Sequence, residues 1–533
     1  MKKQYKILSL LLMGMVLITT SCLKDLDTEP LDKNVTTTNK VFKDTLAFKE
    51  ALAKIYGGYA LTGQQGPAGD PDISGIDEGF SNYLRQYWNC QELTTDEAII
   101  AWNDATIKDF HWHTWTPSDV FITAMYYRIM YQITLANDFI SHCDEYAPKL
   151  SAAEQAELRH YKAEARFLRA LTYWHGIDLF GNMPFVTEKD KVGSFFPKQI
   201  SLTDLFKYIE KELLECESDL IDARKNEYGR ADKAAAWTLL AKLYLNAKVY
   251  TGEEHYDKVI TYTQKVIDAG YSLQPVYGHL FCADNDKSPE IIFAINFDGL
   301  HTRTWGGMVY LVHAAIGGSM NPAEFGVGGG WGGTRTTKAF VEKFYNDGDT
   351  IDTRDSRAMF HTAGQNLEIN DVGTFTDGYA IKKFKNVTST GDPAPHAHPD
   401  YVDTDFPMFR LADVYLMYAE ATLRGGAGGS RSKALEYVNA LRTRAYNGQT
   451  IGNITDAQLT LDFILDERAR ELYWEGHRRT DLIRFGKFSG GSYIWPWKGK
   501  VKEGTATPSH LDLFPIPSSD LNANPNLKQN PGY

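Results

Sequence analysis

Apolar residues recur in residues 158–180 at the spacing of an amphipathic helix. Counting from Leu158, they stand at offsets of 0, 3, 7 and 10, and the apolar pattern continues beyond them. Because residues three, four and seven apart share one face of an α-helix, this spacing predicts a long helix with one buried face. Gly181 and Pro184 favour its end at the last apolar residue of the run.

Further helical segments occur in pairs. Residues 256–267 carry mostly apolar side chains at offsets of 0, 3, 4, 7, 10 and 11, and Gly270 favours the end of that helix. The Ala-rich segment 232–248 precedes it, so that the span from Ala234 to Ile267 is 34 residues, and a second pair at 411–445 spans 35. Both lengths are close to the roughly 34-residue period of tetratricopeptide repeats. The pattern predicts a mainly α fold built on degenerate, tetratricopeptide-like helix pairs.

Two long segments interrupt the helical pattern. Residues 61–115 contain Gly, Pro, Asp and many aromatic residues without a helical period, and residues 275–400 are rich in Gly, Thr and Asp. Short apolar runs in the second segment, such as Ile291 to Ile295, predict short strands. Loops of this length usually carry function. We therefore expect a single domain over residues 41–533, a helical scaffold that carries two loop inserts.

The N-terminus has the pattern of an export signal. Three lysines precede an apolar run from Ile7 to Ile18, which is too short for a transmembrane helix, and small residues lead to Cys22. Such an ending resembles a bacterial lipobox, in which the cysteine is acylated. We expect residues 1–21 to be a lipoprotein signal peptide, Cys22 the lipidation site and residues 22–40 a tether that holds the protein on a membrane. An ordinary secretory signal is the alternative.

Composition narrows the class of protein. Hydrophobic residues make up 43%, aromatic residues 13% and charged residues 23% of the chain, which excludes disordered, collagen-like and coiled-coil proteins. Removal of residues 1–21 would take away three lysines and change the net charge from −12 to −15. So acidic a chain is a poor candidate for nucleic-acid binding. The four cysteines after Cys22 form no close pair, and we interpret them as buried thiols.

Five segments in order along the chain resemble the SusD/RagB family of glycan-binding outer-membrane lipoproteins, and together they cover nearly the whole mature chain. The segments are EARFLRALTYWHGIDLFGNMPF (164–185), KAAAWTLLAKLYLNAKVY (233–250), FRLADVYLMYAEA (409–421), the helix DERARELYWEGHRRTDLIRFGKF (466–488) and FPIPSSDLNANPNLKQNPGY (514–533). Residues 63–102 and 298–312 make the resemblance strongest to the starch-binding members of the family.

The resemblance implies a SusD-like fold, with tetratricopeptide-like pairs on one side and a glycan-binding face of inserted loops on the other. It implies a protein that is lipid-anchored in the outer membrane and exposed at the cell surface. It also implies capture of an α-glucan, starch or maltooligosaccharide, and its delivery to a SusC-like TonB-dependent transporter. The same role for another glycan such as dextran or levan is the alternative. The family is not catalytic and requires no cofactor.

Three tryptophans in the inserts are candidates for sugar binding. Sugar rings stack on aromatic faces and their hydroxyls need fixed polar partners. Trp305 precedes two glycines and Trp331 lies between two glycine runs, so little neighbouring side-chain bulk is expected to cover these two rings. Trp102 belongs to the segment that resembles the starch binders. Core packing is the alternative for each ring. By the resemblance, Asp77 and Arg85 match polar sugar contacts and the three tryptophans match an aromatic arc.

The chain departs from the starch-binding pattern at three positions. Ile100 replaces a tryptophan, Ala105 replaces an asparagine, and Trp305 replaces a tyrosine. Loss of one ring and one amide, together with enlargement of another ring, is expected to change affinity or the preferred ligand curvature.

Other chemistry has weaker support in the sequence. Glu467 and Glu471 lie four apart on one predicted helix, and paired carboxylates are what a glycoside hydrolase needs. The arginines at 468, 470, 478 and 479 make ion pairing the simpler interpretation. A scaffold that binds only protein is a further alternative.

Two kinds of metal site have candidate residues in the sequence. His111-x-His113 and His396-x-His398 lack a nearby third ligand, so we interpret these residues as loop or strand histidines. Asp284 and Asp286 offer oxygen ligands for a structural Ca²⁺, although the same string also favours a turn.

Overall fold

The computed structural model describes residue 42 and residues 44–64, 66–67, 71–190, 193 and 195–533. The predicted signal peptide, the lipidation site Cys22 and the tether at 22–40 all lie outside the described residues and stay predictions. The chain divides into two units, residues 1–48 and residues 49–533, and the second is described below. The predicted start of the domain at residue 41 is not tested by this division.

Helices make up most of the regular structure, as the sequence predicts, and the strands are short. The helices are α3 (Thr45–Ala60), α4 (Tyr83–Glu92), α5 (Asp109–Trp112), α6 (Val120–Tyr146), α7 (Ala152–Phe180), α8 (Leu202–Cys216), α9 (Lys233–Leu245), α10 (Ala247–Thr251), α11 (Tyr256–Asp268), α12 (Gly307–Ala314), α13 (Lys338–Val341), α14 (Leu411–Leu423), α15 (Arg431–Ala445), α16 (Leu461–Leu472), α17 (Arg478–Arg484) and α18 (Ser518–Ala523). The strands are β1 (Ile99–Ile100), β2 (Ile291–Ile295), β3 (Thr334–Arg335), β4 (Phe360–His361), β5 (Ala380–Ile381) and β6 (Phe406–Arg410).

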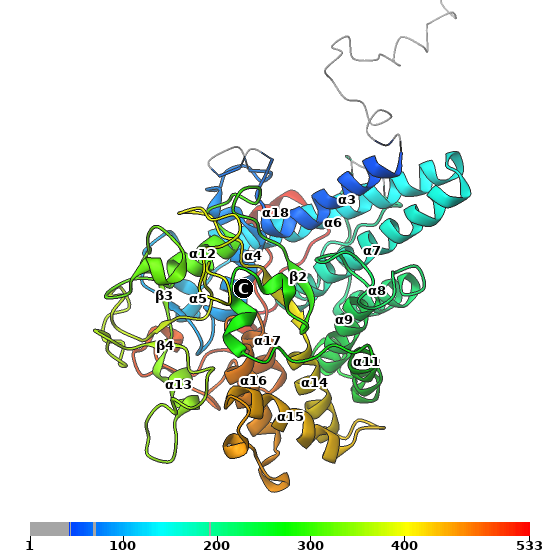
Figure 1. Ribbon diagram of the computed structural model, residues 1–533. Coiled ribbons are helices and arrows are strands. Elements are labelled where there is room, and N and C mark those ends of the chain that lie inside the picture. Colours follow the sequence, from blue (N-terminus) through cyan, green and yellow to red (C-terminus); the bar gives the residue numbers. More distant parts are fainter. Residues whose placement is uncertain (1–41, 43, 65, 68–70, 191–192, 194) are drawn as a thin grey trace, which may run out of the picture. The chain divides into compact units, whose positions relative to one another are not determined.

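Paired helices form the scaffold. Helix α6 packs on α7 and α7 on α8, and the series α9, α11, α14 and α15 packs in the same neighbour-to-neighbour way. In Figure 1 helices α8, α9 and α11 lie to the right, while α12, α13 and β3 of the long insert lie to the left. The predicted mainly α fold of helix pairs that carry loop inserts is therefore confirmed.

Helix α7 shows why the periodic segments were predictable. Ser151 and Glu154 form a capping box at its start, and Gly181, with φ of 71°, follows its last residue. The apolar side chains that recur from Leu158 onward are all buried. In the first half of the helix, burial of one stripe against its neighbours produces the 3.6-residue pattern. From Phe167 to Phe180 every residue is buried, so the predicted single buried face is wrong for the second half.

The segment 466–488, predicted as one helix, is two helices. Helix α16 ends at Leu472, and α17 begins at Arg478. In the break, Trp474 and Gly476 have positive φ of 64° and 79°, which an α-helix does not accommodate. The carboxylate of Glu92 accepts hydrogen bonds from the backbone N–H of Gly476 and His477, at 2.6 and 3.1 Å. A distant side chain therefore stabilises the break.

The first loop insert contains a helix that the sequence did not reveal. All ten residues of α4 are buried, including polar ones, so the helix has no exposed face. Tyr83, Leu84, Tyr87 and Trp88 recur at helical spacing, but the run is short and lies in a segment rich in Gly, Pro and Asp. Its polar side chains have partners: Gln91 donates to Asp178 at 3.0 Å, and Asn89 accepts from the Tyr310 hydroxyl at 3.0 Å. The expectation of irregular structure throughout 61–115 was wrong for this reason.

Among the described residues, the strands form three two-stranded antiparallel sheets, β1–β3, β2–β6 and β4–β5. The apolar run 291–295 is β2, which confirms the predicted short strand, and its partner β6 leads directly into α14. The four cysteines of the second unit, 90, 143, 216 and 282, are buried free thiols, as predicted.

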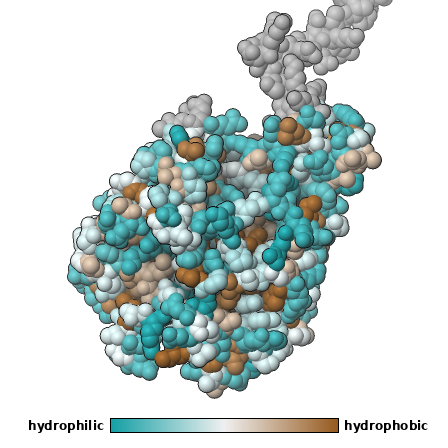
Figure 2. All heavy atoms as spheres, in the orientation of Figure 1, coloured by the Kyte–Doolittle hydropathy of each residue, from teal (hydrophilic) through white to brown (hydrophobic). Residues whose placement is uncertain are grey.

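The face in view in Figure 2 is largely hydrophilic, with hydrophobic residues scattered over it. Among the described residues, none of the helices combines the length and apolar character that a membrane span requires.

Candidate functional site

A short β-ribbon brings Trp102 and Trp331 together. Strand β1 pairs with β3, and just beyond the pair the backbone N–H of Ala101 donates to Gly333 at 2.9 Å. Trp102 follows β1, and Trp331 comes shortly before β3. The indole Nε1 of Trp102 donates to the carbonyl of Trp331 at 3.1 Å, and the two ring centroids lie 6.3 Å apart with planes at 43°.

The glycine-rich segment beside Trp331 packs against the end of α12. The last carbonyls of a helix lack partners within the helix, and here three backbone N–H groups satisfy carbonyls at that end. The bonds are Trp331 N to His313 O, Gly332 N to Ile316 O and Gly333 N to Ala314 O, each of 2.8 Å. The backbone that carries Trp331 is therefore anchored to a helix.

Two of the glycines are needed for this close approach. A Cβ at Gly330 would lie 2.4 Å from the carbonyl oxygen of Ile316, and one at Gly333 would lie 2.6 Å from the Trp102 ring. The sequence suggested that the glycines leave the Trp331 ring uncovered. They instead let the chain approach α12 and Trp102, which fixes where the ring stands.

Trp305 lies just before the first residue of α12 and adds a third tryptophan ring to Trp102 and Trp331. Its ring centroid lies 6.3 Å from that of Trp331 and 5.3 Å from that of Tyr401. Its backbone N–H donates to Glu78 at 3.0 Å. The rings of Trp102, Trp331, Trp305 and Tyr401 thus form one continuous series, which we call the aromatic arc. Its three tryptophans are half-buried and Tyr401 is buried, so the tryptophans are neither core residues nor free side chains.

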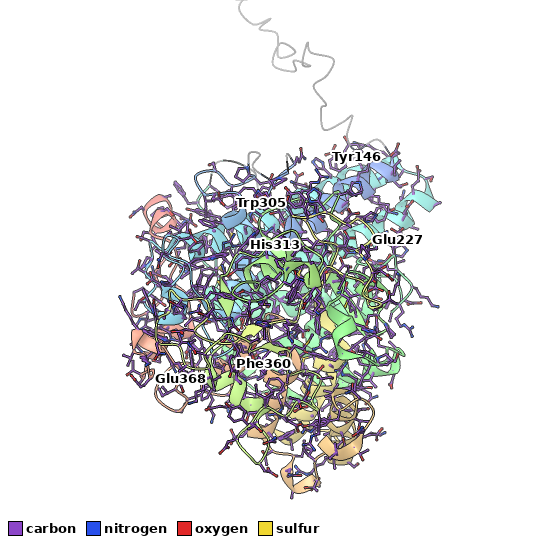
Figure 3. All side chains as sticks on the ribbon, turned by 60° about the vertical axis from the view of Figure 1, so that its left-hand side comes forward. Tyr146, Glu227, Trp305, His313, Phe360 and Glu368 are labelled. Carbon is purple, nitrogen blue, oxygen red and sulfur yellow. The ribbon has the colours of Figure 1, made fainter. Side chains whose placement is uncertain are left out.

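His313 supports the middle of the aromatic arc. Its imidazole stacks on Trp331 with centroids 4.8 Å apart and planes at 20°, and Figure 3 shows it near Trp305. The two ring nitrogens lie 2.7 and 3.0 Å from the carbonyl oxygens of Gly329 and Asp400. Burial lowers the pKa of His313, although these carbonyls oppose that effect. A fixed ring therefore covers one face of Trp331.

Arg85 lies within the frame that holds the rings. It is buried on α4, and its guanidinium carbon lies 4.3 Å from the centroid of Tyr310, 4.8 Å from that of Phe80 and 5.9 Å from that of Trp102. Burial lowers its pKa, while Tyr310 and Asp77 raise it. An arginine stays charged in a protein, so these contacts are cation–π interactions.

Asp77 is the more open of the two predicted polar contacts. It is exposed, and its carboxylate accepts a hydrogen bond from the backbone N–H of Phe80 at 3.3 Å. The ring of Phe80 in turn lies 4.8 Å from the Arg85 guanidinium carbon, which places Asp77 beside Arg85. The structure therefore brings all five predicted glycan residues into one region.

The three departures from the starch-binding pattern differ in their surroundings. Ile100 is fully buried in β1, so this position contributes to the core and not to the aromatic arc. Ala105 is exposed with φ of 39°, in the left-handed region where asparagine is favoured over alanine. Trp305 contacts two neighbouring rings, so its larger indole is part of the arc.

Sequence reasoning missed several residues of this region. Tyr401 closes the aromatic arc, the guanidinium carbon of Arg303 lies 5.5 Å from its ring centroid, and the His398 ring lies 4.7 Å from it. Tyr401 stands 70 residues after Trp331 in an irregular segment. No periodicity or motif links the two, although the pair His396-x-His398 marked the segment as unusual.

The proposed calcium ligands serve a turn in the structure. The carboxylate of Asp284 accepts from the backbone N–H and the hydroxyl of Ser389 at 2.7 and 2.8 Å, and Asn285 donates to Leu280 O and Asp405 O. The Ca²⁺ site at Asp284 and Asp286 stays a prediction. In the described part of the chain, the group of potential metal ligands that converges is a different one, made of Asp298, His396 and Asp403.

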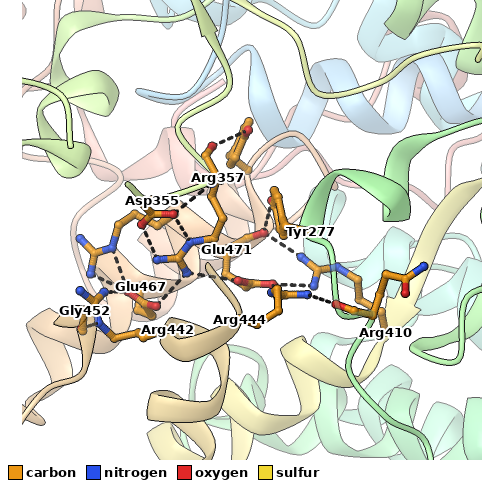
Figure 4. Close-up of polar contacts among 12 residues, drawn as sticks. Tyr277, Asp355, Arg357, Arg410, Arg442, Arg444, Gly452, Glu467 and Glu471 are labelled. Carbon is orange, nitrogen blue, oxygen red and sulfur yellow. Dashed lines mark hydrogen bonds and ion pairs between the residues drawn. The ribbon is translucent and has the colours of Figure 1, made fainter. Parts of the chain in front are cut away.

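Glu467 and Glu471 are fully buried in an ion-pair cluster (Figure 4). Glu467 pairs with Arg357, Arg442 and Arg470 at 2.8 Å each. Burial alone would raise the pKa of Glu471, but arginines 444, 410 and 357 outweigh it and lower the pKa to about 2. A glycosidase acid needs a raised pKa and contact with the sugar. Ion pairing is therefore confirmed as the role of these glutamates.

Only one of the four arginines that the sequence indicated as ion-pair partners contacts Glu467 or Glu471. Of the four neighbouring arginines, only Arg470 contacts Glu467. Arg468 pairs with Asp413 and Asp481, and Arg478 pairs with Asp96. The other cluster arginines come from segments far away in the sequence, which the local pattern could not indicate.

The first histidine pair is structural, but its setting was partly mispredicted. His111 lies in the short helix α5 rather than in a loop or strand, and both histidines are buried. The Nε2 atom of His113 lies 2.8 Å from the carbonyl of Thr94, and burial lowers the pKa of His113 to about 3.

Comparison with known proteins places the chain in a family. Residues 365–533 match the model of the SusD family, and residues 74–245 match a family described as "starch-binding associating with outer membrane". The chain is 37% identical to the starch-binding protein SusD of Bacteroides thetaiotaomicron, over 96% of both chains. It is 27% identical to the SusD-like protein P25 of Formosa agariphila, over 76% of this chain and 78% of that protein.

Solved structures show the same fold. A SusD superfamily protein from Bacteroides vulgatus has a TM-score of 0.71 at 20% identity, with 92% of this chain and 100% of that chain covered. The surface glycan-binding protein A of Bacteroides thetaiotaomicron, solved with laminarihexaose, has a TM-score of 0.68 at 19% identity, covering 91% and 98%. These matches agree with the mainly α SusD-like fold that the sequence predicts. The chain belongs to the SusD family.

Proposed function

We propose that the protein is a cell-surface lipoprotein of the outer membrane that binds an α-glucan, starch or a maltooligosaccharide, and delivers it to a SusC-like TonB-dependent transporter. The observation that carries the proposal is the aromatic arc. Three half-buried tryptophans stand in series on backbone anchored to α12 and to the β1–β3 ribbon. Such a series offers successive stacking faces to successive sugar rings.

Polar groups beside the aromatic arc supply orientation. Sugar hydroxyls both donate and accept hydrogen bonds, and charged partners make the stronger ones. Asp77 is exposed and serves as an acceptor. Arg85 is buried, so its contribution is to pack against the rings of Phe80, Tyr310 and Trp102.

The choice of an α-glucan rests on two arguments. A relative named for starch binding shares 37% identity with this chain. The planes of successive rings are also tilted by 43°, 57° and 41° instead of lying in one plane, which suits the natural bend of α-1,4-linked glucose. Ile100, where the starch-binding pattern has a tryptophan, is buried and adds no ring to the aromatic arc, which keeps dextran and levan as alternative ligands. We propose binding rather than hydrolysis because the two candidate catalytic glutamates are buried in ion pairs.

Calorimetry of the purified full chain tests the ligand. We expect binding of maltoheptaose or cyclodextrin and no binding of cellohexaose, with dextran and levan measured in parallel. Replacement of all three arc tryptophans by alanine is expected to abolish binding. The matched control is Trp237→Ala, a half-buried tryptophan of α9 that donates to Glu217 at 2.7 Å and lies outside the arc. Binding to levan alone would contradict the α-glucan, and unchanged affinity in the triple variant would contradict the arc.

Fractionation of cells tests the location. Acylation at Cys22 is expected to place the protein in the outer membrane, and Cys22→Ala to release it. Incorporation of radiolabelled fatty acid into the Cys22→Ala protein as efficiently as into the unchanged protein would contradict the assignment.

Affinity purification from gently solubilised membranes tests the partner. A TonB-dependent transporter is expected to co-purify, because the family resemblance implies this partner and helical-repeat surfaces bury large areas. Repeated recovery of the protein alone, under conditions that preserve known membrane complexes, would contradict the partnership.

A further inference from the structure

A second pair of half-buried tryptophans, Trp112 and Trp497, lies outside the aromatic arc. Trp112 is the last residue of α5, and Trp497 precedes the short turn Lys498–Lys500, which packs against α5. Lys500 joins the two rings. Its backbone N–H donates to the carbonyl of Trp497 at 3.1 Å, and its ammonium nitrogen lies 4.5 Å from the ring centroid of Trp112.

The backbone that carries Trp497 and Lys500 is strained. Their φ angles are 70° and 61°, in the left-handed region that residues with bulky side chains rarely adopt. The surrounding loop maintains this conformation, since the backbone N–H of Trp497 donates to the carbonyl of Lys502 at 3.2 Å and a Cβ at Gly499 would clash with Thr505. Strain of this kind is concentrated at binding and catalytic sites.

Trp497 is held beside the strand that leads to the aromatic arc. Its ring packs against the cluster of Ile99, Ile369 and Val372, and its indole N–H donates to the carbonyl of Ile369 at 3.0 Å. Ile99 is the first residue of β1, and Trp102 follows three residues later. Since a strand advances about 3.3 Å per residue, these two positions on the strand are roughly 10 Å apart.

Trp112 is connected to the same end of the arc through Lys108. The ammonium group of Lys108 donates to the side chain of Asn103, which directly follows Trp102, and its nitrogen lies 5.9 Å from the ring centroid of Trp112. On the other side, Lys500 is exposed. A cation–π contact at an exposed site is weak, so a sugar ring can displace this lysine from Trp112.

Polar side chains of several kinds border the two rings. Lys502 donates to Asn370 at 2.7 Å, and both residues are exposed. The exposed carboxylates of Asp371 and Glu503 are their neighbours in sequence. Amides, ammonium groups and carboxylates together supply the donors and acceptors that sugar hydroxyls need. Because charges of both signs are present, a neutral glycan fits better than a polyanion such as a nucleic acid.

We propose that Trp112 and Trp497 form a second glycan-binding surface, which takes up a polymer chain where it leaves the Trp102 end of the aromatic arc. The inference rests on the proposed function and adds a dependence on chain length, since a compact ligand occupies the arc alone. Two linked contacts with one polymer raise its apparent affinity without any stronger single contact. The pair escaped sequence reasoning because its members are separated by more than 380 residues.

Two ligands of different extent test the second surface. Cyclodextrin is a closed ring that stays on the arc, whereas amylose is long enough to continue from the arc over Trp112 and Trp497. Binding of each ligand to the full chain in mild detergent is measured by calorimetry. We expect amylose to bind about tenfold or more tightly than cyclodextrin, because it engages both surfaces at once.

Two double variants separate the second surface from the arc. Trp112→Ala/Trp497→Ala is expected to lower the affinity for amylose to that for cyclodextrin and to leave cyclodextrin binding unchanged, which also shows that the variant folds. Asn370→Ala/Lys502→Ala, at two exposed positions, is expected to weaken amylose binding several-fold. The matched control is Trp237→Ala, since this half-buried tryptophan also has a lysine, Lys265, 5.3 Å from its ring centroid. It is expected to leave both affinities unchanged.

The outcomes distinguish a failure of the second surface from a failure of the proposed function. Unchanged affinity for amylose in the double tryptophan variant, with cyclodextrin still bound, would overturn the second surface and leave the arc in place. If that variant loses cyclodextrin binding as well, Asn370→Ala/Lys502→Ala decides: a selective loss of amylose affinity supports the surface, and unchanged affinity overturns it. If the unchanged protein binds neither ligand, the proposed function fails, and the second surface fails with it.

Discussion

Polar contacts have different roles in the aromatic arc and in the buried ion-pair cluster. In the cluster of Figure 4, Glu467 and Glu471 are fully buried and each contacts three arginines. In the aromatic arc, the tryptophans are half-buried and Asp77 is exposed. The polar contacts of the cluster are thus directed inward, at other parts of the chain, while those of the arc fix the backbone and leave parts of the rings open.

The difference teaches that residue type alone does not identify a binding or catalytic site. Paired glutamates are typical of glycosidases, yet here they join α16 to arginines of β6, of α15 and of the loop that carries Arg357. Tryptophans are more often core residues, yet three of them stand at the surface on anchored loops. Exposure and the distance to the nearest opposite charge separate the two cases.

The largest effect is expected from breaking the cluster. Glu471→Gln keeps the shape of the side chain but removes the charge opposite three buried guanidinium groups. Removal of one partner from a buried ion pair costs about 3–5 kcal/mol because the remaining charge is left uncompensated. We expect the free energy of unfolding in urea to fall by about this amount, while the folded fraction binds glycan as before.

A matched surface glutamate provides the control for that variant. Glu436 pairs with Lys433 on α15, and the side chains are 62% and 53% exposed. Glu436→Gln is expected to change the free energy of unfolding by less than about 1 kcal/mol. A loss in Glu471→Gln no larger than in this control would show that the cluster contributes no specific stability.

The pH dependence of stability should come from the same cluster. The pKa of Glu471 is about 2 in the folded protein and roughly 4.3 in an unfolded chain. A lowered folded pKa means that the stabilisation is complete above the unfolded pKa and is lost as pH falls through the folded one. Between pH 4.5 and pH 2, we expect the titration of Glu471 to lower the free energy of unfolding by on the order of 3 kcal/mol.

Urea unfolding at several pH values measures this contribution. The curve of stability against pH is expected to be shallower for Glu471→Gln than for the unchanged protein in the acid range, and parallel to it above pH 5. Equal slopes below pH 4.5 would contradict the assignment of the lowered pKa to this carboxylate.

The next largest effect is expected from Trp331→Ala, which tests whether Trp331 binds glycan or packs in the core. Trp331 is the central ring and contacts both Trp102 and Trp305. Trp331→Ala is expected to reduce glycan affinity roughly tenfold, since stacked aromatic contacts contribute about 0.5–1.5 kcal/mol beyond burial and both neighbouring rings lose a support. Calorimetry measures the affinity, and Trp237→Ala is expected to leave it unchanged. A large loss of stability with unchanged affinity would identify Trp331 as a core residue.

The same contrast explains what could be predicted from the sequence. Helix α11 and the first half of α7 were predictable because one stripe of each is buried while the other side is more exposed. Helix α4 was not recognised, because its short apolar run lies within a segment rich in Gly and Pro and its polar residues are buried as well. The break at Trp474 was not predictable either, since Glu92, which stabilises it, lies more than 380 residues away.

The candidate site divides in a similar way. Trp102, Trp305 and Trp331 were found through their glycine-rich surroundings and the family resemblance. Tyr401 and the ligand group around Asp298 were not found, because their partners are distant in sequence and lie on irregular loops without a periodic pattern. Local sequence reports which residues are unusual, whereas the fold decides which of them meet.

A smaller effect is expected at the polar edge of the aromatic arc. Asp77→Asn keeps the size of an exposed side chain and removes its charge, so the folded structure should persist. A hydrogen bond to a charged group contributes about 1.5–3 kcal/mol, of which the neutral amide retains part, and we expect glycan affinity to fall several-fold. The control is Asp462→Asn, a carboxylate 82% exposed on α16. Equal affinity in both variants would exclude Asp77 from the site.

The smallest effect is expected at the position where the arc itself departs from the starch-binding pattern. Trp305→Tyr restores the residue that the resemblance implies there, and a phenol ring still reaches its neighbours Trp331 and Tyr401. We expect affinity for maltoheptaose to change by less than about threefold, because a stacking face remains, whereas Trp305→Ala should cost several-fold or more. Calorimetry with maltoheptaose and cellohexaose measures both affinity and choice, and the preference for the bent glycan should persist in the tyrosine variant. If tyrosine weakened binding as much as alanine does, the indole would be acting through its size or its N–H group, and a continuous series of stacking faces would no longer explain the site.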